Sequence, residues 1–169
     1  MSCEKKDSVI ISVIMSVRNS EKNISDSILS ILNQTYFDFE FIIVDDCSND
    51  NTWNIILSFS DNRVIAIKNE KNIGIFPSLN IAIKKAKGKY IAIMDESHIA
   101  MPDRLWKQLY YMENNREVLA LGAQFECSNP DLIIKMPIHF DEICAELLNG
   151  NCFLHSSLFI RSEIMNQSG

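Results

Sequence analysis

The hydrophobic residues of this chain fall into two alternating patterns. Nearly unbroken apolar runs rich in valine and isoleucine predict strands that are buried on both faces of a sheet. Between these runs, apolar residues recur every three or four positions, which predicts amphipathic helices. The predicted strands are Val9–Val17, Phe41–Val44, Val64–Ile67, Tyr90–Met94 and Val118–Phe125, and the predicted helices cover residues 24–34, 52–59, 79–86 and about 102–115, with Gly88 as the stop of the third helix.

The alternation of strands and helices along the chain predicts an α/β fold. At this spacing it indicates a three-layer α/β/α sandwich around a mostly parallel, Rossmann-like sheet. The pattern weakens beyond Asn129, where Ile133–Met136 and Phe153–Ile160 are interpreted as strands and Glu142–Leu148 as a helix. The chain has 169 residues and 47% hydrophobic content, which is enough for a sizeable core. We therefore predict a single domain over residues 1–169.

Polar clusters follow three of the predicted parallel strands. They are Ser16–Asn19, Asp45–Asp46 and Asp95–His98. Right-handed crossovers bring the carboxyl ends of parallel strands to one edge of the sheet, where open α/β sheets bind their ligands. The convergence of three clusters therefore predicts a ligand site. A loop with Asp, Glu and His suits a divalent cation and the phosphates it holds, although a solvated acidic turn has the same local pattern.

Charge and cysteine content narrow the class of protein. The formal net charge of −6 argues against a nucleic-acid-binding protein, which usually carries a basic face. The five cysteines form no CxxC pair, so they predict reduced thiols in a cytoplasmic protein and not a zinc site or a disulfide framework. The run Val9–Val17 is too short to span a bilayer and follows charged residues, so it predicts a strand and not a signal peptide or a transmembrane segment.

The sequence also lacks the glycine-rich motifs that hold phosphates through backbone amides. No GxGxxG follows the first predicted strand, and no GxxxxGK[ST] occurs anywhere. Without such a cradle, the phosphates of a nucleotide need a cation, which acidic residues at the strand ends are suited to hold. The same residues could instead form hydrogen bonds to a ribose or a base. This combination favours a diphosphate that is bridged by a metal ion.

The chain resembles the family 2 glycosyltransferases of the GT-A fold in five segments: ISVIMSVRN, SILNQTYFDFEFIIVDDCSNDNT, NEKNIG, AKGKYIAIMDESHIAMPDRL and HSSLFIRSE. The resemblance is dense over Ile11–Asn115 and thinner over Asn151–Ile164. Members of that family transfer a sugar from a nucleotide-diphosphate sugar to an acceptor, usually with Mn²⁺ or Mg²⁺. The resemblance implies a nucleotide-binding half over residues 1–115 and an acceptor half over residues 116–169.

The resemblance also implies which residues bind the nucleotide. Asp46 matches the residue that hydrogen-bonds the base, with Asp45 beside it. Ser16 and Arg18 fall where the family has Pro or Thr and then Tyr, which stacks on the uracil; the guanidinium plane of Arg18 could stack in its place. The complete set implied by the resemblance is Ser16, Arg18, Asn19, Asp45, Asp46, Asp95 and Glu96. We expect Asp46→Ala to weaken nucleotide binding by about 1–3 kcal/mol and barely to alter folding.

The segment Asp95–His98 lies on the DxD segment of the family, and Ser97 occupies the position of the usual metal-ligating Asp. The metal ligands that the resemblance implies are therefore Glu96, Ser97 and His98. A hydroxyl is a weaker ligand for a hard cation than a carboxylate, and an imidazole suits Mn²⁺ better than Mg²⁺. His155 matches a histidine that is common in the family, and it is equally interpretable as a histidine at the edge of the core.

No catalytic residue is assigned. In the family the base is a downstream carboxylate of an ED-type motif, and this chain ends at Gly169, about where that region begins. We therefore expect a C-terminally short domain with an incomplete acceptor half. Asp141 and Glu142 are acidic residues of that half, and we interpret them as the solvated start of a helix.

Two functions remain open at this point. The first is an inverting glycosyltransferase of polysaccharide biosynthesis, with a UDP-sugar donor and a glycan or a lipid-linked acceptor. The alternative is an inactive GT-A-like remnant that serves as a nucleotide-binding or interaction module. Asp45–Asp46 favours the first and Ser97 the second. A homo-oligomer or a partner chain would cover the expected gap in the acceptor half. A nucleotidyltransferase is a third, more distant interpretation, since it normally carries a glycine-rich loop after its first strand.

Overall fold

The chain alternates strands and helices, as the hydrophobic pattern predicts. The computed structural model describes residues 9–124, 126, 137, 142–143 and 154–165. Its elements in chain order are β1 (Ile11–Val17), α1 (Ile24–Leu32), β2 (Phe39–Asp45), α2 (Thr52–Ser58), β3 (Val64–Lys68), α3 (Ile75–Lys85), β4 (Tyr90–Met94), α4 (Arg104–Asn114), β5 (Ala120–Leu121), the 3₁₀ turn η1 (His155–Ser157), β6 (Phe159–Arg161) and α6 (Ser162–Met165). None of the described helices is long and apolar enough to cross a membrane.

The strands form one six-stranded sheet in the order β3-β2-β1-β4-β6-β5. Strands β1 to β4 pair in parallel, whereas β6 runs antiparallel to both β4 and β5. The chain builds the sheet outward from β1 to β3 and then returns to the other side of β1 to form β4. The direction of winding therefore reverses between β1 and β4, and such a reversal opens a crevice at the carboxyl ends of the strands.

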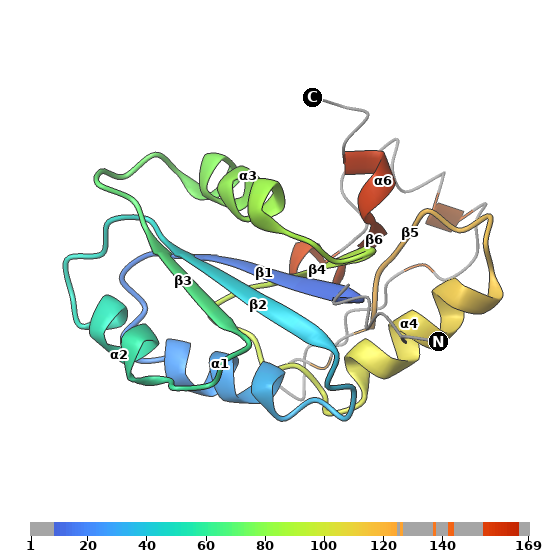
Figure 1. The fold of residues 1–169 in the computed structure, drawn as a ribbon, viewed down its shortest axis with the longest axis horizontal. Helices are drawn as coiled ribbons and strands as arrows, with labels where there is room; N and C mark the ends of the chain where they lie inside the picture. Colours follow the sequence, from blue (N-terminus) through green and yellow to red (C-terminus); the bar gives the residue numbers. More distant parts are fainter. Residues whose placement is uncertain (1–8, 125, 127–136, 138–141, 144–153, 166–169) are drawn as a thin grey trace, which may run out of the picture.

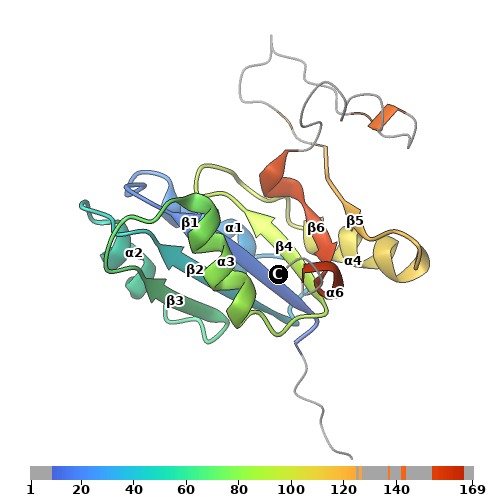
Figure 2. The ribbon, with the colours of Figure 1, turned by 90° about the horizontal axis from the view of Figure 1, so that it is seen from above.

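Helices cover both faces of the sheet, which confirms the predicted three-layer arrangement (Figure 1). Alternate residues of a strand point to opposite faces. Accordingly Val13 and Met15 pack in the cluster that includes α1, α2 and α4, whereas Ile14 packs in the cluster that includes Leu79 and Ala82 of α3. Helix α3 lies across β1 and β2, as the view from above shows (Figure 2). All residues of β1 and β2 are buried, which explains their nearly unbroken apolar sequences.

The prediction for the end of α3 is wrong. The helix begins at Ile75, ahead of the apolar face that starts with Leu79, and Ala86 follows its last residue, so Gly88 does not cap it. Gly88 is needed for a different reason. A Cβ at this position would lie 2.4 Å from the backbone nitrogen of Ser12, so only a glycine lets the chain pass this close to β1.

The predicted elements beyond α4 agree with the structure only in part. The predicted strand Val118–Phe125 shortens to Ala120–Leu121, at the edge of the sheet. The predicted strand Phe153–Ile160 is replaced by η1 and by the short strand β6. Glu142 and Ile143 are helical. Ile133–Met136, Asp141 and residues 144–148 lie outside the described residues.

Candidate functional site

A pocket of about 170 Å³ opens at the carboxyl edge of the sheet, at the reversal point between β1 and β4. The ends of β1 and β2, the loop that enters α3 and the loop after β4 all contribute to it. Its lining residues are Ser16, Val17, Arg18, Asp46, Asn72, Gly74, Ile75 and Glu96. The structure thus brings together one or more residues of each polar cluster that the sequence places after a strand. A second, open hollow of about 420 Å³ lies along residues 68–71 and Ile73 of the same β3–α3 loop.

Asp46 holds the β3–α3 loop through its carboxylate. Oδ1 accepts hydrogen bonds from Asn69 Nδ2 and from the backbone N–H of Ile73, both at 2.9 Å, and Oδ2 accepts one from the N–H of Gly74 at 2.8 Å. Burial opposes the charged form, but these hydrogen bonds, with Ser78 nearby, outweigh it and hold the pKa of Asp46 below its ordinary value. Asp46 is only 3% exposed. The burial and these bonds lead us to expect that its loss would also affect folding, unlike the expectation from the sequence.

Asp45 points away from the pocket. Its side chain is fully buried and accepts hydrogen bonds from the hydroxyl and the backbone N–H of Ser48. Lys68 lies 3.9 Å from Oδ2, and its ammonium group stands over the ring of Trp53. Adjacent residues at the end of a strand face opposite sides. Asp45 therefore shapes the turn after β2, and only Asp46 reaches the pocket.

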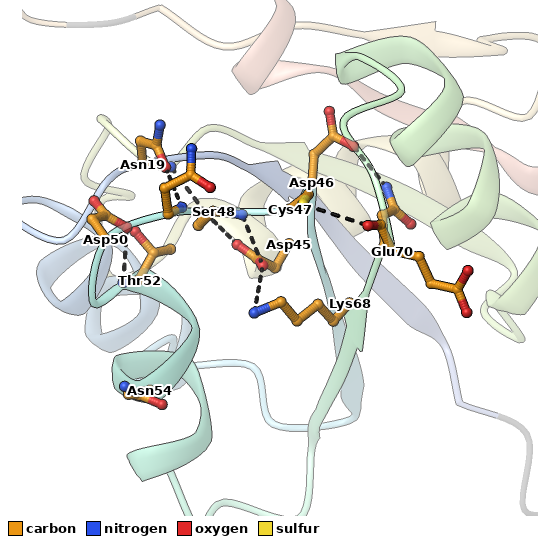
Figure 3. A network of polar contacts seen from close by, with 12 residues as sticks. Asn19, Asp45, Asp46, Cys47, Ser48, Asp50, Thr52, Asn54, Lys68 and Glu70 are labelled. Carbon is orange, nitrogen blue, oxygen red and sulfur yellow. Dashed lines mark hydrogen bonds and ion pairs between the residues drawn. The ribbon is translucent and has the colours of Figure 1, made fainter.

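Asn19 links the loop after β1 to the loop after β2 (Figure 3). Its backbone N–H donates to Ser48 Oγ at 3.0 Å, and its Oδ1 accepts from the N–H of Asn49 at 2.8 Å. Two more bonds tie the loops together: Ser20 N–H donates to Thr52 Oγ1, and Glu21 N–H to the carboxylate of Asp50. Asn19 has a positive φ of 52°. It therefore fixes the backbone beside Arg18 and is not part of the pocket lining.

The Asp95–His98 loop is a tight turn built around Asp95. The N–H of His98 donates to the carbonyl of Asp95, and Asp95 Oδ1 accepts both the N–H and the hydroxyl of Ser97, at 2.9 and 2.5 Å. His98 Nδ1 lies 3.5 Å from the same oxygen. Glu96 instead faces the pocket, where burial raises its pKa and the neighbouring charge of Asp95 adds to the effect.

Asp95, Ser97 and His98 offer oxygen and nitrogen atoms of the kinds that a divalent cation takes as ligands. Within the described part of the chain, no three His, Cys, Asp or Glu residues are grouped as metal ligands. Among the described residues, the contacts of Asp95 fall on Oδ1, beside His98 and Ser97. Mg²⁺-type sites often use one or two carboxylates and complete their shell with substrate phosphates and water. The predicted ligand set is divided: Ser97 and His98 gather around Asp95, while Glu96 lies in the pocket.

Sequence reasoning missed a group of polar residues on and just after α1 that contact this loop. Ser27 and Ser30 lie one turn apart on α1, and Gln34 follows the end of the helix. All three form hydrogen bonds with the segment between Glu96 and Leu105. The available signal was their spacing, because polar residues at helical intervals on a face beside buried Ile24, Ile28 and Ile31 need partners.

Arg104 connects β4 to the turn that carries His155. Its Nη2 donates to the carbonyl of Ile93 at 2.9 Å and its Nε to Gln108, which in turn donates to the carbonyl of Ser157 at 2.8 Å. Burial of the guanidinium lowers the pKa of Arg104 to about 10. The ring of His155 meets the ring of Phe76 edge-on, with centroids 6.2 Å apart. His155 therefore lies beside the first turn of α3, whose residue Ile75 lines the pocket.

Comparison with known proteins shows which family the chain resembles. A family model described as "Glycosyl transferase family 2" matches residues 12–166. The chain is 39% identical over 170 residues to an uncharacterized glycosyltransferase of Methanocaldococcus jannaschii, covering 95% of this chain and 59% of the relative. It is 35% identical over 146 residues to the Escherichia coli UDP-Glc:alpha-D-GlcNAc-diphosphoundecaprenol beta-1,3-glucosyltransferase WfgD, covering 86% of this chain and 57% of the relative. The chain thus spans less than two thirds of the length of these relatives.

Solved structures with low sequence identity share the fold. The structure of S. aureus TarS 1–349 in complex with UDP has a TM-score of 0.76 at 22% identity and covers 94% of this chain and 48% of that one. The mannosyltransferase PcManGT from Pyrobaculum calidifontis, in complex with GDP-Man and Mn²⁺, has a TM-score of 0.73 at 17% identity and covers 94% of this chain and 46% of that one. These neighbours confirm the GT-A type of α/β fold.

Proposed function

This chain belongs to glycosyltransferase family 2, and from that premise we propose that it binds a UDP-sugar in the pocket at the ends of β1, β2 and β4 and transfers the sugar to an acceptor. The observation that carries the proposal is the convergence of Ser16, Arg18, Asp46 and Glu96, from three separate strand ends, on one pocket. A chance solvated turn would account for one such cluster, but not for three that meet at the reversal point of the sheet.

We assign the binding of the nucleotide base to Asp46 and Arg18. An ionised carboxylate has about four acceptor positions. Asp46 uses three of them for the loop, so it keeps one for an N–H of the base. Arg18 is exposed beside it and presents a planar guanidinium on which a base can stack. Asn19 and Asp45 are assigned a supporting part, because they hold the two loops that carry Arg18 and Asp46.

We assign the binding of the diphosphate to the Asp95–His98 loop. Asp95, Ser97 and His98 would hold a Mn²⁺ or Mg²⁺ ion together with the phosphate oxygens, with Glu96 at the adjoining wall of the pocket. When bound, such an ion neutralises the negative charge that develops on the departing nucleotide diphosphate. The chain's own part is to keep the carboxylate of Asp95 and the imidazole of His98 on the same side of the turn.

For the acceptor we propose a glycan or a lipid-linked sugar, with inversion at the anomeric carbon. The name of the E. coli relative, which specifies a diphosphoundecaprenol acceptor, supports a lipid-linked substrate. Inversion requires the acceptor hydroxyl to approach opposite to the leaving diphosphate and to lose a proton to a base. We assign no base. We place two described residues on the acceptor side of the pocket: Phe76, in the first turn of α3, and His155, whose ring contacts it.

The test is a titration of the labelled 169-residue chain with UDP, with Mn²⁺ and with a chelator, followed through the backbone amide shifts. We expect shifts at residues 16–19, 46, 72–75 and 95–98, and tighter binding with Mn²⁺. UDP release from UDP-glucose, UDP-galactose and UDP-N-acetylglucosamine, with lipid-linked and free glycan acceptors, then tests the transfer. Absence of UDP binding, or shifts confined to residues 154–165, would contradict the proposal.

A further inference from the structure

Ser27 of α1 begins a row of polar side chains, and it hydrogen-bonds the backbone on both sides of Ser97. The hydroxyl of Ser27 lies 2.7 Å from the carbonyl oxygen of Glu96 and 2.8 Å from that of His98. Ser27 is fully buried, so no water competes for its single proton, and the two carbonyls share that proton. The backbone of Ser97 therefore forms a short arch whose two ends are fixed to one side chain.

Two more polar residues continue this row: Ser30, one turn further along α1, and Gln34, just after the helix ends. Ser30 Oγ donates to the carbonyl of Ser27 and accepts from the N–H of Ala100. Gln34 Nε2 donates to the carbonyl of Met101 at 2.7 Å, and Gln34 Oε1 accepts from the N–H of Leu105 at 3.0 Å. The last bond satisfies one of the free N–H groups at the start of α4. The segment from Glu96 to Leu105 is thus held by side chains of α1 and of the residue Gln34 that follows it.

We propose that Ser27 and Ser30 are positioning residues that set the Asp95–His98 loop in the geometry that a nucleotide diphosphate and its divalent cation need. The inference rests on the proposed function and adds to it the device that orients the loop. The carbonyl of Glu96 is held toward α1, which leaves its carboxylate directed to the pocket. A loop that is ordered during folding does not lose that entropy again when the ligand binds, and this raises affinity.

The first experiment compares UDP affinity with Mn²⁺ and with a chelator for the wild-type chain and for Ser27→Ala. Removing one hydrogen bond to a loop of this kind corresponds to about a 3- to 10-fold loss of affinity with Mn²⁺. With the chelator we expect less than about a 2-fold change, because the contacts of the base to Asp46 and Arg18 stay in place. Hydrogen exchange of residues 96–101 should be faster in the variant.

Two further variants keep the test decisive. Ser30→Ala removes the contact to Ala100 from a half-buried position and should reduce the Mn²⁺-dependent affinity in the same way, even if Ser27→Ala is too unstable to study. Ser58→Ala is the matched control, since this exposed helical hydroxyl donates to the carbonyl of Ile55 in its own helix and has no other partner among the described residues. An equal loss of affinity with Mn²⁺ and with chelator, or no loss in either α1 variant, overturns the inference while wild-type binding leaves the proposed function standing. A wild-type chain that binds no UDP overturns both.

Discussion

At the scale of single residues, the carboxylates at the strand ends differ in what they contact. Asp45 is fully buried and serves the turn after β2. Asp46, next to it, accepts bonds from the β3–α3 loop and still lines the pocket. Glu96 lines the pocket with a raised pKa, and Asp95 organises the turn beside it. Carboxylates that look alike in the sequence therefore have different roles. Some hold the structure and others face the pocket, depending on where each side chain points.

Asp46→Ala should reduce both stability and nucleotide affinity. It removes the acceptor for Asn69, Ile73 and Gly74, so the free energy of unfolding should fall by about 1.5–3 kcal/mol. Urea unfolding measures this change, and calorimetry with UDP measures the affinity. Asp38→Asn, at an exposed position, should change neither.

The contribution of Asp46 to stability should also depend on pH. Because the pKa of Asp46 is lowered in the folded state, this contribution is present above the ordinary Asp pKa and is lost as the pH falls through the lowered value. Unchanged stability in the variant would mean that the loop does not depend on Asp46.

Ser97→Asp should make nucleotide binding depend more strongly on a divalent cation. The new carboxylate would stand beside Asp95, whose oxygen now accepts the hydroxyl of Ser97 at 2.5 Å. Two neighbouring carboxylates repel each other until a cation joins them, and a hard cation prefers carboxylate oxygen. We expect a several-fold rise in the ratio of UDP affinities with Mn²⁺ and with chelator. Ser97→Asn, which is uncharged and of similar size, should show no such rise. If both variants match the wild type, this position does not touch the cation.

Protonation of Glu96 should weaken ligand binding as the pH falls. Its pKa is raised by burial and by Asp95, so it takes up a proton at a higher pH than an ordinary Glu. For an acid with a raised folded-state pKa, the contribution to stability is present at low pH and is lost as the pH rises through that pKa. The Mn²⁺-dependent affinity for UDP should have the opposite trend and fall as Glu96 is protonated. Titration calorimetry across the mildly acidic range measures it. In Glu96→Gln the affinity should be lower at neutral pH and should change less between neutral and mildly acidic pH; an unchanged pH dependence would show that Glu96 does not contribute.

At the scale of elements, a close contact between two backbone segments fixes the path of the chain after α3. After α3 the chain passes directly under β1, where the N–H of Gly88 donates to Ser12 Oγ at 2.8 Å. Ser12 in turn donates to the buried carboxylate of Glu40, which also accepts the N–H of Lys87. This contact fixes the start of β4 beside β1. It therefore fixes the register in which Met15 pairs with Met94, just before the two strand ends of the pocket.

Gly88→Ala should destabilise the fold strongly, although it adds only one methyl group. The added Cβ would meet the backbone nitrogen of Ser12 at 2.4 Å and the carbonyl carbon of Ile11 at 2.8 Å, and neither atom can move without shifting β1. Overpacking of this kind costs about 1–3 kcal/mol, and we expect the upper end here. Denaturant unfolding measures the loss. Lys87→Ala, at the exposed neighbouring position, should stay within about 0.5 kcal/mol of the wild type. A variant of Gly88 as stable as that control would rule out the close approach.

At the scale of the whole molecule, four segments that are separate along the chain meet around Arg161. This buried side chain donates to the carbonyls of Met112 and Asn115 at the end of α4, to the carbonyl of Val118 and to the hydroxyl of Tyr90. It thus joins β4, α4, the segment before β5 and β6. Because β6 follows η1 directly, Arg161 also anchors the turn that carries His155 at the rim of the site.

Arg161→Lys should loosen this junction although it keeps the charge. A lysine cannot reproduce the planar fork of donors, so several of the carbonyls would lose their partner. We expect the free energy of unfolding to fall by about 2–3 kcal/mol. Hydrogen exchange should accelerate at residues 118–121 and 159–161, where the anchored strands lie. Arg116→Lys, on the exposed surface, should alter neither measurement. Exchange that accelerates equally across the parallel strands would show a general loss of stability and not the opening of this junction.

The sequence by itself determined the order and type of most elements and the edge where the site lies. Strands β1, β2 and β4 are buried on both faces, so their hydrophobic runs are visible without a structure. The prediction was weakest for β5 and β6, because short antiparallel strands at an edge bury few side chains and leave little periodicity. The polar clusters after the strands were evident because parallel strands share one carboxyl edge.

Only the tertiary structure decided what each polar residue contacts. Local sequence does not reveal that Asp45 turns inward and Asp46 outward, because this depends on where β2 ends relative to its neighbours. Nor does it reveal that Ser27 holds the carbonyls of Glu96 and His98, or that Gly88 lies against Ser12, since these pairs are about 70 or more residues apart in the chain. Periodicity reports which face of an element is apolar, whereas a hydrogen bond between distant loops exists only once the sheet has set their distance.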